Sequence, residues 1–147
     1  MMNSFAVSVI VALALPTAEL RTPAGAPFSL AEVLTPGPAV VVLWSSWLPG
    51  AQEFAALLPE VEEAARRRGW RGVVVLFQDD PAEGLARLPQ RGLSWPRAVD
   101  ARGELVRQLK ISRAPVVLLV NAAGGIEEKA GPGVEEVRAL LASWRTN

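Results

Sequence analysis

The side chains that most often do chemistry in proteins are missing from this sequence of 147 residues. It contains no cysteine, no histidine and no tyrosine. Without a thiol there is no disulfide, no thiolate nucleophile and no thiolate metal ligand. Without an imidazole there is no Ser-His-Asp arrangement and no side chain whose ordinary pKa lies near neutrality. We therefore expect neither a metal site nor a bound cofactor.

Carboxylates, hydroxyls, arginines and two lysines remain for catalysis. The candidates for acid–base chemistry are Glu53, Asp79 and Asp100, each acting with an arginine. No two of these groups stand out as an acid and its base. An enzyme that uses carboxylates is therefore an alternative function rather than the first one.

The neighbouring acids Asp79 and Asp80 have a structural interpretation. Asp80 is followed by Pro81 and Glu83, a pattern typical of a helix start in which Asp80 is the capping residue. A metal site at this pair is the weaker interpretation, because no third ligand is near in the sequence.

The charges balance, with 15 basic and 15 acidic residues and a formal net charge of zero. No overall field attracts nucleic acid or an anionic membrane. Arg66, Arg67, Arg68 and Arg71 form a local cluster whose spacing suits the C-terminus of a helix, where cations stabilise the helix dipole. A phosphate or RNA patch is the alternative, and we expect no nucleic-acid partner.

An uncharged apolar run extends from Phe5 to Leu15, before Pro16. As a helix it would span about 16 Å, too little for a bilayer core of about 30 Å. Its length is typical of an export signal, although no basic residue precedes it, and an additional buried strand is the alternative. We expect residues 1–16 to form one of these and residues 17–147 to form a single domain. An export signal predicts a location outside the cytoplasm, and it is the one feature that could associate with a membrane. If the run is instead a strand, a cytoplasmic location is expected.

Apolar runs predict the strands of this domain. Ala39–Trp44 and Val73–Phe77 contain no charged or strongly polar side chain, as in strands buried on both faces. Shorter strands are expected at 96–100, 116–121 and 126–130. The glycine turn between the last two makes them an antiparallel hairpin, so the predicted sheet is mixed.

Helices are expected between the strands. The predicted helices start near Ser29, run from Pro49 to Gly69 with a kink at Pro59, start at Pro81, and cover 103–110 and 134–144. Trp70, Trp95 and Trp144 are assigned to core or helix-end packing. Alternation of strands and helices predicts an α/β fold of three layers, with helices on both faces of the sheet.

Residues 39–53, AVVVLWSSWLPGAQE, resemble the strand, turn and helix of the TlpA-like branch of the thioredoxin superfamily. The turn in that branch usually reads W-A-x-W-C-x-x-C. The residues from Trp44 to Trp47 match the approach to this turn, and Leu48 and Ala51 occupy the positions of the two cysteines. Pro49-Gly50 fills the middle of the motif.

Residues 96–126 resemble the second half of the same family. There an Asp, a glycine turn and a helix lead to a strand that begins with a cis-proline. The resemblance makes Pro115 that proline and Ala114 the residue before it. It covers residues 17–146 and implies a thioredoxin-like fold with a central mixed sheet flanked by helices.

The departures from the family exclude its usual activity. Leu48 carries no nucleophile and Ala51 cannot resolve a mixed disulfide. The hydroxyls of Ser45 and Ser46 have no neighbouring base in the sequence and cannot replace a thiolate. We expect no thiol–disulfide oxidoreductase activity.

The resemblance also implies a groove between the turn and the cis-proline, where an extended peptide pairs with backbone. This β-augmentation needs no cysteine. The candidate binding residues are Trp47, Leu48, Pro49, Gly50, Ala114 and Pro115. Ala114 would offer its backbone to a protein or extended peptide, and Trp47 with Leu48 would form an apolar lip. The alternatives are that Trp47 packs against the domain, as Trp44 does, and that the chain is a purely structural subunit.

Overall fold

The computed structural model describes residues 16–146, so the apolar run expected to be a signal or a strand lies outside the described residues. The strands are β1 Leu20–Arg21, β2 Pro27–Phe28, β3 Ala39–Trp44, β4 Arg71–Phe77, β5 Arg97–Asp100, β6 Val116–Val120 and β7 Ile126–Ala130. The helices are α2 Leu30–Leu34, α3 Ala51–Ala56, α4 Leu58–Arg67, α5 Pro81–Arg87, α6 Glu104–Gln108 and α7 Val134–Thr146. Within 16–146, no helix is both long and apolar enough to span a bilayer.

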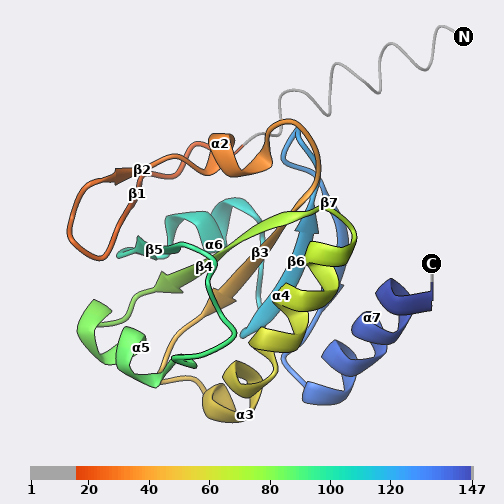
Figure 1. Cartoon of the computed structure of the whole chain (residues 1–147). Helices are drawn as coiled ribbons and strands as arrows, with labels where there is room; N and C mark the ends of the chain where they lie inside the picture. Colours follow the sequence, from red (N-terminus) through yellow and green to blue (C-terminus); the bar gives the residue numbers. More distant parts are fainter. Residues whose placement is uncertain (1–15, 147) are drawn as a thin grey trace, which may run out of the picture.

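The strands form one mixed sheet in the order β2-β1-β5-β4-β3-β6-β7 (Figure 1). β3, β4 and β5 are parallel, whereas β6 runs antiparallel to β3 and pairs with β7 in the predicted hairpin. In the centre of the sheet Val42 lies between Val74 and Val117. The mixed sheet predicted from the sequence is confirmed.

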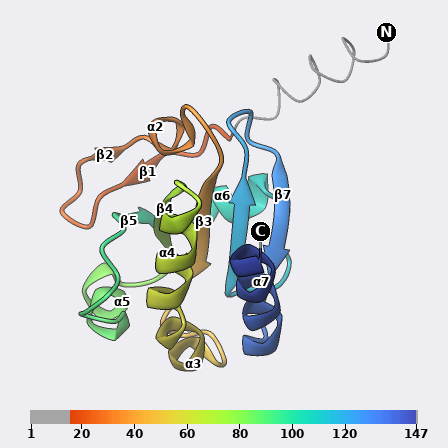
Figure 2. The same cartoon turned by 45° about the vertical axis from the view of Figure 1, so that its right-hand side comes forward.

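Side chains alternate across β3 and so fill two cores. Val42 and Trp44 lie in the core under α3, α4 and α7, and Val41 and Leu43 lie in the core under α2 and α6. Figure 2 shows α4 and α7 in front of the sheet and α6 behind it. The three-layer α/β arrangement is therefore confirmed, and β3 is buried because both of its faces are covered.

The helix predicted from Pro49 to Gly69 is two helices. α3 begins at Ala51, after Gly50 with a left-handed φ of 73°, and the chain leaves the α3 hydrogen-bond pattern at Leu57. α4 then starts with Pro59 in its first turn, where a residue without an N–H is tolerated. The sequence predicted that Pro59 would kink one long helix. In the structure Pro59 lies in the first turn of a new helix instead.

The predicted helix caps fare differently. The Ser29 hydroxyl accepts a hydrogen bond from the Glu32 N–H at 3.3 Å, which confirms the cap expected for α2. Asp80 does precede α5, but its side chain makes no capping hydrogen bond. That part of the prediction is wrong, and its neighbour Asp79 has a different partner, described below.

Candidate functional site

The turn after β3 has two hydrogen-bonded steps. The Leu48 N–H donates to the Ser45 carbonyl at 3.3 Å, and the Ala51 N–H donates to the Leu48 carbonyl at 3.1 Å. The buried Trp44 fixes the turn to α3, because its indole N–H donates to the Ala51 carbonyl at 2.9 Å. Leu48 is half-buried on this turn, and the Pro49-Gly50 pair is exposed.

Trp47 lies at the edge of the turn with 56% of its surface exposed. Its indole N–H donates to the Gln78 carbonyl at 2.9 Å, and its ring meets the edge of Phe77 at a centroid distance of 5.9 Å. Trp47 thus contacts the domain and still presents most of its ring to solvent. Because both contacts fix its orientation, little side-chain entropy remains to be lost on binding.

Asp79, two residues after the end of β4, holds the same turn, a contact that no local sequence pattern indicates. Its carboxylate accepts the Ser46 N–H at 2.7 Å and the Ser46 hydroxyl at 2.9 Å. The buried Ser45 hydroxyl donates to the Phe77 carbonyl. Both hydroxyls near the turn therefore hold it to β4 and to the segment that follows β4.

The loop before β6 lies at the same end of the sheet as this turn, because Val116 pairs with Leu43. The peptide bond between Ala114 and Pro115 is cis, and Pro115 is buried. Leu48 and Ala114 both pack against the apolar core under α2 and α6. Within residues 16–146, neither the N–H nor the carbonyl of Ala114 has a hydrogen-bond partner.

Gly131 closes the loop from its other side. A Cβ built on Gly131 would lie 2.4 Å from the Pro115 carbonyl oxygen and 3.3 Å from the Phe54 ring, so only a glycine fits this approach. We call Trp47, Leu48, Pro49, Gly50, Ala114 and Pro115 together the turn surface.

The carboxylates considered for catalysis have separate surroundings. Glu53 is exposed on α3, Asp79 holds Ser46, and Asp100 is buried at the end of β5. No cluster of three or more potential metal-binding side chains occurs in the described part of the chain. This arrangement gives no support to the alternative of a carboxylate enzyme.

Asp100 has a structural task that predicts a pH effect. Its carboxylate accepts the N–H groups of Glu104 and Leu105, each at 2.9 Å. Burial nevertheless raises the pKa of Asp100 above its ordinary value of 3.8, because desolvation outweighs these hydrogen bonds. The folded state therefore binds this proton more tightly than the unfolded state does.

We expect the free energy of unfolding of the wild type, relative to an Asp100→Asn variant, to fall as the pH rises. The decrease should begin near pH 3.8 and end above the raised pKa in the folded state. Urea unfolding of both proteins between pH 3 and pH 7 measures it. A difference that stays constant or rises with pH would contradict the assignment.

Arg66, Arg67 and Arg68 follow the helix-end interpretation at the C-terminus of α4, but Arg71 does not, because it is the first residue of β4. Arg66 forms ion pairs with Glu62 and Glu63 along α4. Arg68 lies 4.9 Å from the centre of the Trp70 ring and donates to a backbone carbonyl of α7. These guanidinium groups have partners within the domain, as solvated helix-end cations do.

Comparison with solved structures identifies the architecture as a thioredoxin-like fold. A secreted disulfide oxidoreductase of Mycobacterium tuberculosis, described as homologous to Escherichia coli DsbE, aligns over 85% of this chain and 94% of its own with 21% identity and a TM-score of 0.64. StoA from Bacillus subtilis aligns over 90% and 98% with 22% identity and a TM-score of 0.63. A thiol-disulfide oxidoreductase from Bacteroides fragilis aligns over 87% and 96% with 20% identity and a TM-score of 0.67.

No protein-family model matches the sequence, and no curated protein matches it. At these identities the likeness shows the fold. The chain has the architecture of thiol–disulfide oxidoreductases and contains no thiol, with Leu48 and Ala51 in the turn that follows β3. The expectations for the turn surface remain predictions.

Proposed function

We propose that the chain is a redox-inactive binding module that holds an extended protein segment against the turn surface. One observation carries this proposal: the backbone of Ala114 is unpaired within the described residues, at the end of the sheet where the turn after β3 presents the exposed and oriented Trp47. An unpaired backbone N–H and carbonyl can add a strand from a partner, and an exposed aromatic side chain at the same end of the sheet can anchor that partner.

The charges near the turn surface favour a partner segment that contains acidic side chains. Lys110, Arg113 and Lys129 are exposed, and among residues 16–146 none of them forms an ion pair. Arg113 and Lys129 line the same small cavity, of about 150 Å³, together with one carboxylate, Glu136, which accepts the Gly133 N–H. Unpaired cations of this kind steer acidic partners and favour their binding.

Two of the solved structures support a location outside the cytoplasm. One is described as secreted, and another is an exposed lipoprotein thioredoxin of Streptococcus pneumoniae. In this proposal the apolar run at residues 5–15 is an export segment, and the partner is met outside the cytoplasm.

The binding experiment selects peptides and then maps where they bind. Random 12-residue peptides are selected on the immobilised wild type, and their affinities are measured by calorimetry. We expect Trp47→Ala with Leu48→Asp to weaken binding by about 30-fold or more, as for an interface anchor. N-methylation of one peptide backbone amide should weaken binding by a similar factor, because it removes a strand hydrogen bond.

The matched control is Ile126→Asp. Ile126 is also an exposed apolar residue, and it lies at the opposite end of β6 and β7 from Pro115. This variant should bind as the wild type does. Equal peptide affinity of the wild type and the double variant would show that the turn surface is not the peptide-binding site.

A further inference from the structure

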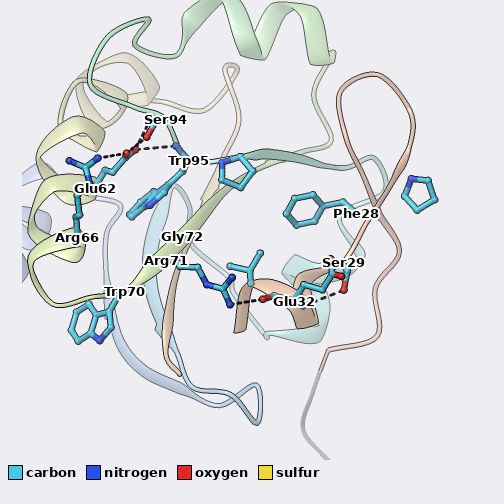
Figure 3. A pocket seen from close by; sticks show the side chains of 13 residues that line it. Phe28, Ser29, Glu32, Glu62, Arg66, Trp70, Arg71, Gly72, Ser94 and Trp95 are labelled. Atoms are coloured by element: carbon cyan, nitrogen blue, oxygen red, sulfur yellow. Dashed lines mark hydrogen bonds and ion pairs between the residues drawn. The ribbon is translucent and has the colours of Figure 1, made fainter. Parts of the chain in front are cut away.

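A cavity of about 450 Å³ lies at the other end of β4 from the turn surface. Residues of β2, α2, α4, the start of β4 and the segment before β5 line it (Figure 3). Its volume is within the range of about 300–1,000 Å³ that small-molecule sites occupy. The length of β4, roughly 20 Å for seven residues, separates it from Trp47. A ligand here would not touch the turn surface.

Aromatic rings form opposite walls of this cavity. Figure 3 shows Trp95 on one side and Phe28 on the other, with Gly72 next to Trp95. Gly72 cannot carry a side chain, because a Cβ there would lie 2.4 Å from the Trp95 ring. Trp70 is half-buried and adds a third ring to the lining. The space between the rings suits a flat apolar group.

Glu62 holds the Trp95 wall in place and has no free acceptor for a ligand. One carboxylate oxygen accepts the Ser94 N–H at 2.7 Å and the Trp95 N–H at 3.1 Å. The other accepts the Arg66 guanidinium at 2.8 Å and the Ser94 hydroxyl. Burial alone would raise the pKa of Glu62, but these hydrogen bonds lower it overall, so the group stays ionised. The wall is therefore formed before any ligand arrives.

Two opposite charges beside the rings, Arg71 and Glu32, form no ion pair within the described part of the chain. Arg71 donates from Nη2 to the Glu32 backbone carbonyl at 2.8 Å. That hydrogen bond makes the two residues neighbours, so a free cation and a free anion lie at one side of an aromatic cavity (Figure 3).

We propose that this cavity binds a small aromatic α-amino acid. The aromatic ring lies between Trp95 and Phe28, the carboxylate binds the Arg71 guanidinium, and the ammonium group binds the Glu32 carboxylate. A guanidinium group can bind both oxygens of a carboxylate. In an α-amino acid the carboxylate and the ammonium group are attached to the same carbon, so they can reach the neighbouring Arg71 and Glu32 at the same time. The site is independent of the peptide-binding function proposed above.

Calorimetric titration with three related probes tests this site. L-Phenylalanine carries both charges, 3-phenylpropionate only the carboxylate, and 2-phenylethylamine only the ammonium group. We expect phenylalanine to bind saturably with one site per chain, and each singly charged probe to bind about tenfold more weakly.

The two charge variants should separate the probes. Arg71→Gln is expected to weaken the binding of phenylalanine and phenylpropionate about tenfold and to leave the affinity for phenylethylamine unchanged. Glu32→Gln should weaken the binding of phenylalanine and phenylethylamine and leave the affinity for phenylpropionate unchanged. Arg71→Lys keeps the cation without the fork and should give an intermediate affinity.

The Trp47→Ala, Leu48→Asp variant should bind phenylalanine as the wild type does, and circular dichroism confirms that each variant is folded. Absence of saturable phenylalanine binding up to about 20 mM would overturn the proposal, because a desolvated ring and two ion pairs should exceed that affinity. Equal affinity for all three probes, or loss of binding in the Trp47 variant, would overturn it as well.

Discussion

Replacing Leu48 and Ala51 together with cysteine is expected to give a protein that reduces disulfides, whereas the wild type does not. The Ala51 N–H donates to the Leu48 carbonyl at 3.1 Å, so these positions are the ends of a tight turn. The Cα atoms at the ends of such a turn lie within 7 Å, close enough for a disulfide. In this spacing the thiol pKa is lowered, which supplies the thiolate that attacks a substrate disulfide.

Reduction of insulin disulfides with dithiothreitol as electron donor measures this gain. The wild-type rate should equal that of buffer, because the chain has no thiol. Leu48→Cys and Ala51→Cys alone are the controls, since neither can form the intramolecular disulfide that completes turnover. Disulfide reduction by the wild type would refute the redox-inactive assignment, and failure of the double variant to form a disulfide would refute the turn geometry.

Replacing Glu62 with alanine is expected to cost about 1–3 kcal/mol of unfolding free energy. Glu62 is 2% exposed and accepts four hydrogen bonds, and its removal would leave the N–H of the buried Trp95 without a partner. Urea unfolding at pH 7 measures the loss. Glu63→Ala is the matched control, because Glu63 is half-exposed and pairs with surface arginines, so its loss should cost less than about 1 kcal/mol.

The pH dependence of Glu62 has the opposite sign to that of Asp100. The pKa of Glu62 is lowered in the folded state, so its contribution is complete above the ordinary value of 4.5. The contribution is lost as the pH falls through the lowered pKa. The difference in unfolding free energy between wild type and Glu62→Ala should therefore shrink on acidification. A difference that is constant down to pH 2 would contradict this role.

The sequence predicted most of the fold because its signals are local. The run from Ala39 to Trp44 has no strongly polar residue to place in solvent, and a strand buried on both faces is its consistent structure. Ser29 and Glu32 stand three residues apart, which is the spacing of a helix cap. Pro59 correctly predicted that the helix is interrupted near this residue, but helix propensity alone does not distinguish a kinked helix from two consecutive helices.

The candidate sites depend on contacts between distant residues, which a single sequence does not reveal. The local sequence does not distinguish Asp79 from Asp80. Only the position of Ser46, 33 residues away, decides that Asp79 is the one that holds the turn after β3. Glu62 lies on a helix rich in charged residues and has the sequence signature of an exposed residue. Trp95 was expected in the core, and no local pattern places Phe28 opposite it.

The position of β3 in the sheet has a consequence for synthesis on the ribosome. One of its neighbours, β4, follows after about 30 residues, but the other, β6, begins only at Val116. Until that segment emerges, the nascent chain carries an apolar strand with one edge unpaired, which can pair with other chains. The sheet is completed late in translation, and the emerging chain is a natural substrate for chaperones that shield such edges.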